Sequence, residues 1–214
     1  SPGVPPELAA HTITLSYNDP AQASRPFSID RKGMILSEGG AVLVLAAEET
    51  LAAFGLTPKA EVVGIGWTSD AHHFTLPNGR TIVRAIREAI DDAGLAPEDI
   101  AYVNAHGTST PKGDKVEVEC LREVFGHKLS GIPVSSNKSQ IGHSLGAAAA
   151  IEAALGIEAM QQGVILPTIN HIPDPELADV DVVPNTARRQ RYEFFLSNAF
   201  GFGGTNCCVV FRGV

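Results

Sequence analysis

The sequence contains 214 residues, with 16 Lys or Arg against 24 Asp or Glu and a hydrophobic content of 44%. This hydrophobic content suffices for a buried core, whereas the acidic balance argues against a nucleic-acid partner, which needs clustered basic side chains. No apolar run approaches the roughly 20 residues that cross a bilayer, so we expect no membrane partner.

The first residues predict no regular element. The chain starts at Ser1 rather than Met, and residues 1–10 have neither the basic head nor the apolar core of a signal peptide. We therefore expect that the chain begins after a cut. From residue 41 onward, strand-like apolar runs alternate with helical periodicity, which is typical of a layered α/β domain. Residues 41–46 (AVLVLA) predict a buried strand, and residues 48–55 predict a short helix that Gly55 ends.

The middle of the chain predicts a strand over 60–70 and a helix over 80–94, in which Ile82, Ile86 and Ile90 share one face. Two matched units follow, each a strand, a polar loop and a helix. In the first, a strand leads to His106 and then to a helix that Asp114 is placed to cap. In the second, a strand leads to His143 and then to a long alanine-rich helix. Residues 192–200 and 206–214 predict two terminal strands joined by a glycine turn.

The stretch GHSLG at 142–146 matches the Gly-x-Ser-x-Gly pattern of a hydrolase nucleophile elbow. Such an elbow needs an apolar strand immediately before it, whereas the residues before Gly142 are polar. The only later histidine is His171, and the acids between it and Ser144 lie within the predicted helix. We therefore expect Ser144 to satisfy a free amide at a helix start rather than to act as a nucleophile.

His143 and His106 are better candidates for chemistry. A helix start and the nearby Lys138 would both disfavour the charged form of His143, and a neutral imidazole can donate one N–H to a developing oxyanion. Because each histidine follows a strand, the two should meet in one crevice at the carboxyl edge of the sheet. The alternative is that each is an isolated structural histidine.

Three stretches, NAHGTSTPKGD (104–114), SSNKSQIGHSLGAA (135–148) and SNAFGFGGTN (197–206), together resemble the carboxyl-terminal half of the β-ketoacyl-acyl carrier protein synthases. Residues 24–45 are similar to the central segment of the same family. The resemblance implies a thiolase-like α/β fold, of which this chain would be one half of a layered αβαβα architecture with a mixed five-stranded sheet. It assigns 1–40 to a connecting segment and 41–214 to the carboxyl-terminal half-domain.

The resemblance also implies an activity, a decarboxylative Claisen condensation between malonyl-carrier protein and an acyl group held on a cysteine, in fatty acid or polyketide biosynthesis. It implies that His106 and His143 bind the malonyl thioester oxygen, and that Lys138 orders the site with Glu117 as its acidic partner. A structural ion pair is the alternative for Lys138 and Glu117. Asp114 would be a further supporting residue.

Residues that would contact substrate follow from the same resemblance. Thr108 and Thr110 would bind the phosphopantetheine arm that the acyl carrier protein delivers, with loop capping as the alternative for both. Phe202 would act as a gate between the acyl pocket and the nucleophile, with Gly201 and Gly203 allowing the turn to move. No permanently bound cofactor and no metal is implied.

The sequence departs from the family pattern at Ser28, Ser37 and the order EGGA at 38–41, which also resembles the non-catalytic chain-length factors. Those partners usually lack the histidines present here, so the catalytic interpretation is favoured. The family nucleophile lies in the amino-terminal half, and Cys120, Cys207 and Cys208 do not match it. These three cysteines lack the spacing of a zinc site or a disulfide framework, which is typical of the cytoplasm.

The expected partners are therefore the amino-terminal half with its cysteine, the acyl carrier protein, and a second subunit in a homodimer or a ketosynthase/chain-length-factor heterodimer.

Overall fold

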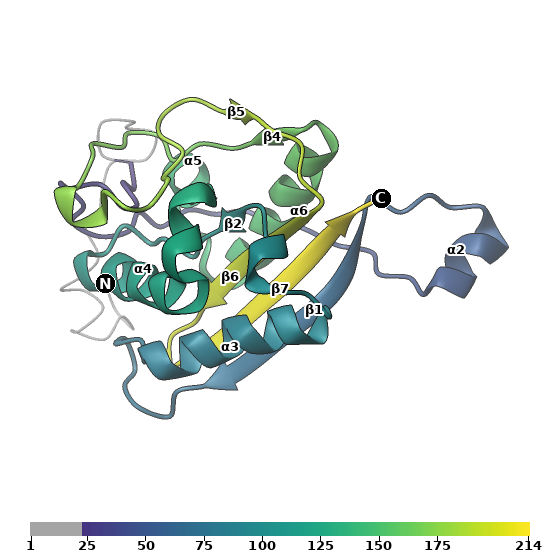
Figure 1. Cartoon of the computed structure of the whole chain (residues 1–214), viewed down its shortest axis with the longest axis horizontal. Coiled ribbons are helices and arrows are strands. Elements are labelled where there is room, and N and C mark those ends of the chain that lie inside the picture. The colour runs from purple at the N-terminus through teal and green to yellow at the C-terminus, as the bar shows by residue number, and fades with distance from the viewer. Residues whose placement is uncertain (1–22) are drawn as a thin grey trace.

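The centre of the computed structural model, which describes residues 23–214, is a mixed five-stranded sheet with the order β1-β7-β6-β2-β3 (Figure 1). The pairs β1–β7 and β7–β6 are antiparallel, whereas β6–β2 and β2–β3 are parallel. The strands are β1 (Ala60–Ser69), β2 (Val103–Asn104), β3 (Val134–Ser135), β6 (Phe194–Phe200) and β7 (Thr205–Gly213). The predicted five-stranded mixed sheet is confirmed, as are both terminal strands.

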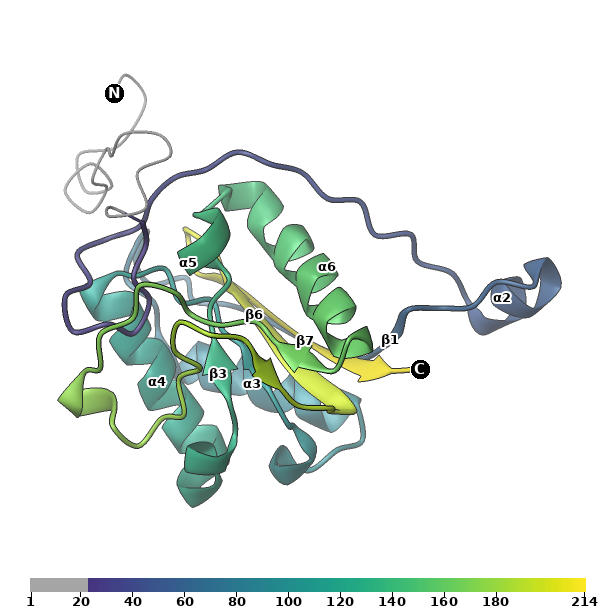
Figure 2. The same ribbon diagram turned by 90° about the horizontal axis from the view of Figure 1, so that it is seen from above.

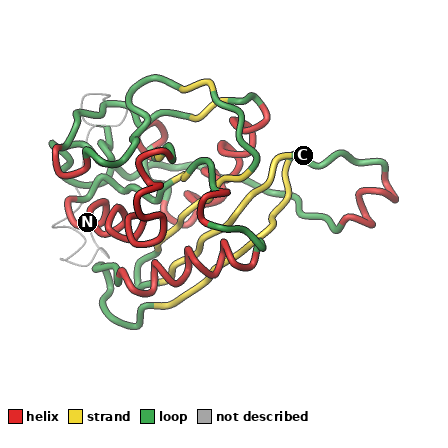
Figure 3. The backbone as a smooth tube through the Cα atoms, viewed as in Figure 1, coloured by secondary structure: helices red, strands yellow, loops and turns green. Residues whose placement is uncertain are grey.

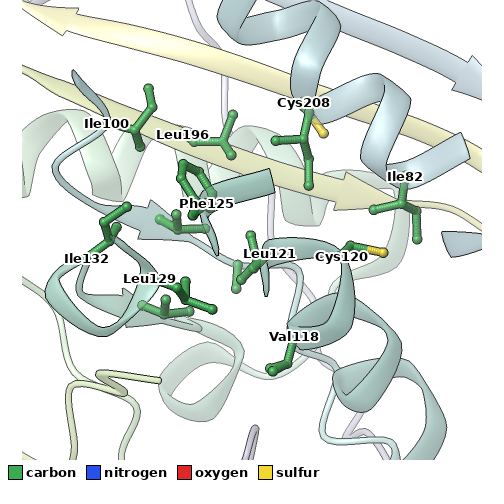
Figure 4. Packing of buried hydrophobic residues seen from close by; sticks show 14 of the residues in the cluster. Ile82, Ile100, Val118, Cys120, Leu121, Phe125, Leu129, Ile132, Leu196 and Cys208 are labelled. Atoms are coloured by element: carbon green, nitrogen blue, oxygen red, sulfur yellow. The ribbon is translucent and has the colours of Figure 1, made fainter. Parts of the chain in front are cut away.

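Helices cover both faces of this sheet. Figure 2 shows α3 (Gly79–Asp92) and α4 (Pro111–Phe125) on one face and α6 (Ala148–Gln161) on the other. The larger apolar core lies under α3 and α4 and includes Ile82, Leu121 and Leu196 (Figure 4). A smaller cluster that includes Tyr102, Phe195 and Phe211 lies under α6. The chain therefore forms three layers: helices, sheet and helix.

Two glycines of β1 allow α3 to lie directly on the strand. A Cβ atom at Gly64 would lie 2.1 Å from the Ala89 carbonyl oxygen, and one at Gly66 would lie 1.8 Å from that of Ala85. Any larger residue at either position would therefore push the helix off the sheet.

Several short elements complete the chain. They are α2 (Glu48–Phe54), α5 (Lys138–Ile141), β4 (Val164–Ile165), β5 (Arg188–Arg189) and short 3₁₀ segments at Pro97–Asp99, Gly126–Gly131, Leu145–Ala147 and Pro175–Leu177. The predicted helices over 48–55 and 80–94 are confirmed, and Gly55 and Gly94 follow them with φ of 62° and 68°. None of the helices found in residues 23–214 has the length and apolarity needed to cross a bilayer.

The prediction of a buried strand over 41–46 is wrong for this chain. Figure 3 shows these residues as a loop that leads out to α2. The side chains of Val42, Val44 and Leu45 are 89%, 90% and 79% exposed, and α2 buries no residue. The physical reason is that no strand of the described chain lies beside this segment, so its backbone groups have no ladder to join.

The prediction that Asp114 caps the helix after His106 is also wrong. Helix α4 begins earlier, at Pro111, and the Thr110 hydroxyl caps it by accepting the N–H of Gly113 at 3.1 Å. Proline is favoured at the first helical position because its missing N–H would be unpaired there. The predictions made for residues 1–22 lie outside the described residues.

Candidate functional site

A cavity of about 700 Å³ opens at the carboxyl ends of the parallel strands β2 and β3. The loop after β2 supplies His106, and the segment after α5 supplies His143. Helices from both faces of the sheet line the cavity, since the first residues of α4 and of α6 are among its lining residues. The lining includes Asp70, His73, Phe74, His106, Thr108, Thr110, Lys112, His143, Glu152, Phe202 and Cys207.

The two histidines meet in this cavity as predicted. Their ring centroids lie 5.6 Å apart, with the ring planes at 84°. The segment before β1 fixes His143, because the His143 N–H donates to the Ile35 carbonyl at 2.7 Å and its carbonyl accepts the Ser37 N–H at 3.1 Å. Gly142 precedes it with φ of 73°, a conformation that favours glycine.

Both imidazoles are neutral at physiological pH. Burial, and secondarily the Lys138 ammonium, lowers the pKa of His143 to about 4. Burial, with Lys138 and His143, also lowers the pKa of His106 well below its usual value. The predicted neutrality of His143 is confirmed in direction, although burial rather than a helix end is the main cause.

A hydrogen bond determines which nitrogen of His143 carries the proton. The backbone N–H of Leu145 donates to Nδ1 at 3.2 Å, so Nδ1 is an acceptor. In a neutral ring the proton therefore sits on Nε2. His143 can thus offer one N–H to an oxygen of a bound molecule.

Lys138 forms the buried ion pair of the site, and its partner is Glu152. The Nζ–Oε1 distance is 2.6 Å, and the two side chains are 1% and 2% exposed. The Lys138 Nζ also donates to the His106 carbonyl at 2.7 Å and lies 3.5 Å from its Nδ1. The predicted pairing of Lys138 with Glu117 is therefore wrong.

Glu117 instead supports the loop that carries His106. Its two carboxylate oxygens accept the backbone N–H groups of His106 and Gly107, each at 2.8 Å, and Oε1 also accepts from Asn198 Nδ2 at 3.1 Å. Asp114 has a comparable position, because its carboxylate accepts the Phe27 N–H at 2.8 Å. Burial raises the pKa of Glu117 and raises that of Asp114 to about 7. Both acids lie behind the site.

Thr108 and Thr110 both line the cavity, with their hydroxyl oxygens 3.1 Å apart. Thr108 is nearly buried, at 8% exposure. The Thr110 hydroxyl also caps helix α4, so the capping role given above as the alternative for Thr110 is observed.

The turn that contains Phe202 closes another side of the cavity. Gly201 N–H donates to the Thr205 carbonyl at 2.6 Å and Gly203 N–H to the Phe74 carbonyl at 2.8 Å, with Gly203 at φ 80°. The Phe202 ring, 40% exposed, stacks on Phe74 with centroids 5.6 Å apart. Within residues 23–214 the Phe202 N–H has no acceptor, so it remains available to a bound molecule.

Ser144 does not act as predicted. Its Oγ is buried without a hydrogen-bond partner among residues 23–214. Ser144 occupies the N-cap position of the segment Leu145–Ala147, but its side chain makes no capping hydrogen bond. Because no base contacts that hydroxyl, the Gly-x-Ser-x-Gly match has none of the geometry of a serine nucleophile.

The three cysteines are not activated nucleophiles. Burial raises the pKa of the Cys207 and Cys208 thiols, and raises that of Cys120 to about 12. A reactive cysteine needs the opposite shift. In the part of the chain that the structure describes, no group of His, Cys, Asp and Glu side chains could hold a metal ion.

Sequence reasoning missed two residues of the site, Glu152 and Phe74. The signal for Glu152 was an acid within an otherwise apolar helix, nine residues after His143. Burying a carboxylate is costly unless it is paired, so such an acid points to a buried cation. Phe74 lies in a loop, and no local pattern indicated its contact with Phe202.

The lowered pKa of His143 predicts acid sensitivity. The unfolded chain binds a proton near pH 6.5 and the folded chain only near pH 4, so stability is present above pH 6.5 and is lost as the pH falls towards 4. We expect His143→Gln to reduce this loss by up to about 3 kcal/mol. The test is urea denaturation of both proteins at pH 7 and pH 4.5. Equal losses in the two proteins would contradict the prediction.

Comparisons with known proteins identify the family of the chain. The family described as "Beta-ketoacyl synthase, C-terminal domain" matches residues 59–171, just over half of the chain. The chain is 44% identical over 202 residues to 3-oxoacyl-[acyl-carrier-protein] synthase 2 of Staphylococcus aureus, covering 92% of this chain and 50% of that protein. It is 42% identical over 207 residues to the protein of the same name from a Synechocystis species, covering 95% and 50%.

Solved structures show the same fold. A β-ketoacyl synthase from Burkholderia phymatum superimposes with a TM-score of 0.88 at 42% identity, covering 97% of this chain and 50% of that one. The ishigamide ketosynthase/chain length factor gives 0.86 at 39% identity, covering 94% and 48%. A type II polyketide ketosynthase in complex with its acyl-carrier protein gives 0.90 at 32% identity, covering 97% and 52%. The chain spans about half the length of the curated relatives it matches, and it belongs to the β-ketoacyl synthase family.

Proposed function

We propose that this chain is the carboxyl-terminal half of a 3-oxoacyl-[acyl carrier protein] synthase, an acyltransferase that condenses malonyl-carrier protein with an acyl group in fatty acid or polyketide biosynthesis. The observation that carries the proposal is the pair of neutral imidazoles that share one cavity beside the buried Lys138–Glu152 pair. The cytoplasm is the proposed location.

The chemistry needs hydrogen-bond donors where negative charge develops. When the malonyl thioester loses carbon dioxide, the electrons of the breaking C–C bond form an enolate whose charge lies on the thioester oxygen. The Nε2–H of His143 and an N–H of His106 would donate to that oxygen, and donors already in position stabilise the charge as it develops. The Lys138 ammonium holds the His106 carbonyl and adds positive charge behind the ring.

The second step forms the new C–C bond. The enolate carbon attacks the carbonyl carbon of an acyl thioester on a cysteine of the amino-terminal half, and the tetrahedral intermediate expels that cysteine as a thiolate. The Phe202 N–H, which has no acceptor within residues 23–214, would bind the oxyanion of this step. Thr108 and Thr110 would hold the phosphopantetheine arm of the carrier protein, which enters the cavity from the rim.

Three observations support a companion half as the partner. The cysteines of this chain are unsuited to nucleophilic attack, and the curated relatives are about twice as long. The chain also exposes Val42, Val44, Leu45 and, on the face of β1 beside α6, Ile65 and Trp67, which are 52% and 72% exposed. An apolar surface of this kind marks an interface. The amino-terminal half is the proposed occupant.

A non-catalytic chain-length-factor-like partner is the alternative, since one structural neighbour contains a chain length factor. The presence of both histidines with their buried ion pair favours the catalytic half. A second subunit, in a homodimer or a heterodimer of these two types, would complete the assembly.

Coexpression with the amino-terminal half of a close relative tests the proposal. We expect the emission of Trp67, the single tryptophan of the chain, to shift to shorter wavelength as its exposed ring becomes buried. A tryptophan-free companion keeps this signal unambiguous. The assembly should then release carbon dioxide from malonyl-carrier protein and form a 3-oxoacyl product.

A companion in which the nucleophilic cysteine is replaced by Ala provides the control. It should give the same shift of Trp67 emission, yet form no condensation product. An assembly that shows the emission shift but releases no carbon dioxide would contradict a catalytic role and favour the non-catalytic partner.

A further inference from the structure

Among residues 23–214, Lys112 is the charged group of the cavity lining that has no counterion. The other titratable lining groups are satisfied within the described chain. Asp70 accepts from Asn206, Asn78 and Thr81, and Glu152 is paired with Lys138. His106 and His143 are neutral, and the Nδ1 of His73 accepts the N–H groups of Thr75 and Leu76.

By contrast, Lys112 lines the cavity, is exposed, and forms no hydrogen bond or ion pair within residues 23–214. Its ammonium therefore carries an uncompensated positive charge at the rim. An anionic group that reaches this rim would be attracted to it.

Four lining residues, His143, Thr108, Thr110 and Lys112, become more exposed in this order, from the interior of the cavity to its surface. His143 is 6% exposed and Thr108 is 8% exposed, whereas Thr110 is half-buried and Lys112 is exposed. A phosphopantetheine arm has a matching order of groups: the thioester, then two amides, then the phosphate at the end attached to the carrier. With the thioester at the histidines and amides at the threonine hydroxyls, the phosphate lies at the surface end of the path.

On this basis, and resting on the proposed function, we propose that the Lys112 ammonium binds the phosphate of the phosphopantetheine arm. Lys112 would thus be a substrate-binding residue that distinguishes phosphorylated from unphosphorylated pantetheine thioesters. The hydroxyls of Thr108 and Thr110 cannot make this distinction, because they contact the uncharged part of the arm.

The test compares malonyl-phosphopantetheine with malonyl-pantetheine, which differ only in the phosphate, as substrates of the assembly with the companion half. We expect Lys112→Ala to raise the KM for malonyl-phosphopantetheine about three- to fivefold and to leave kcat unchanged. This fold-change is the one expected when a single solvent-exposed ion pair is lost. Lys112→Glu should raise it more, and 1 M salt should reduce both effects. The KM for malonyl-pantetheine should stay the same in each variant.

Lys115→Ala is the matched control, because Lys115 is exposed on the same helix but is paired with Glu176 and does not line the cavity. It should change neither KM. Equal KM changes for the two substrates, or none in Lys112→Glu, would overturn the inference while leaving the proposed function intact. An assembly that turns over neither substrate would instead contradict the proposed function.

Discussion

We expect His143→Ala, in the assembly with the companion half, to lower the rate of malonyl decarboxylation by about 10²–10³-fold, which corresponds to the loss of one oxyanion donor. The reason is geometric. The Nε2–H of His143 points from a ring whose Nδ1 is already occupied by the Leu145 N–H, so this ring has one donor and a fixed tautomer. Alanine leaves the developing enolate charge without that donor.

The measurement is release of labelled carbon dioxide from malonyl-carrier protein under single-turnover conditions. His143→Gln should lose less activity than His143→Ala, because the Gln amide can still donate an N–H. His106→Ala should resemble His143→Ala. The double variant should lose less than the product of the two single losses, since both rings would donate to the same oxygen in the proposed mechanism.

Ser144→Ala is the control for His143, because the two residues are adjacent and the Ser144 Oγ has no hydrogen-bond partner in the described chain. We expect it to keep the full rate. A rate that is unchanged in both His143→Ala and His106→Ala would remove the proposed mechanism, and loss of activity in Ser144→Ala alone would return the hydrolase interpretation to consideration.

The meeting of the two histidines was predictable because the rule behind it is topological. Each histidine follows a short strand, and neighbouring parallel strands end at the same edge of a sheet. The pairing register of β2 with β3 places Asn104 beside Ser135, and so brings the two following loops together. No distance had to be known for this inference.

The partner of Lys138 could not be predicted in the same way. Two buried acids, Glu117 and Glu152, lie within reach of the site, and they come from helices on opposite faces of the sheet. The choice between them depends on how α4 and α6 cross the sheet. Periodicity predicts that a helix exists, but it does not determine that crossing.

Residues 41–46 show a different limit. Their alternation of Val and Leu indicates a strand that needs neighbours on both sides, and this preference is a local property. Whether a neighbour exists depends on chain that lies elsewhere. The sequence therefore predicts burial of these side chains, but nothing in the described chain covers them, and Val42 and Val44 are exposed. The start of α4 could be predicted from the sequence, because Pro111 is favoured at the first helical position and Thr110 before it is a preferred cap residue.

The Lys138–Glu152 pair leads to the largest expected effect on stability. Both charges are out of water, and each is compensated mainly by the other. Removal of one partner leaves an unpaired charge in a medium of low polarity, which costs about 3–5 kcal/mol of the free energy of unfolding. We therefore expect Glu152→Ala to destabilise the assembly by this amount in urea denaturation at pH 7.

Helix α6 supplies its own control. Glu158 lies on the same helix and pairs with Lys59 at 2.9 Å, but both side chains are more than half exposed. Glu158→Ala should cost far less free energy of unfolding than Glu152→Ala, because solvent screens exposed pairs. The comparison holds the helix and the type of substitution constant and varies burial alone.

A double variant separates the structural from the catalytic role of the pair. Lys138→Met with Glu152→Leu removes both charges and keeps apolar volume, so it should recover much of the stability that Glu152→Ala loses. It should not recover decarboxylation, because the ammonium that holds the His106 carbonyl is gone. If Glu152→Ala lowers the free energy of unfolding no more than Glu158→Ala does, the Lys138–Glu152 pair does not stabilise the site as expected. If the double variant restores both stability and activity, Lys138 is not needed to position His106.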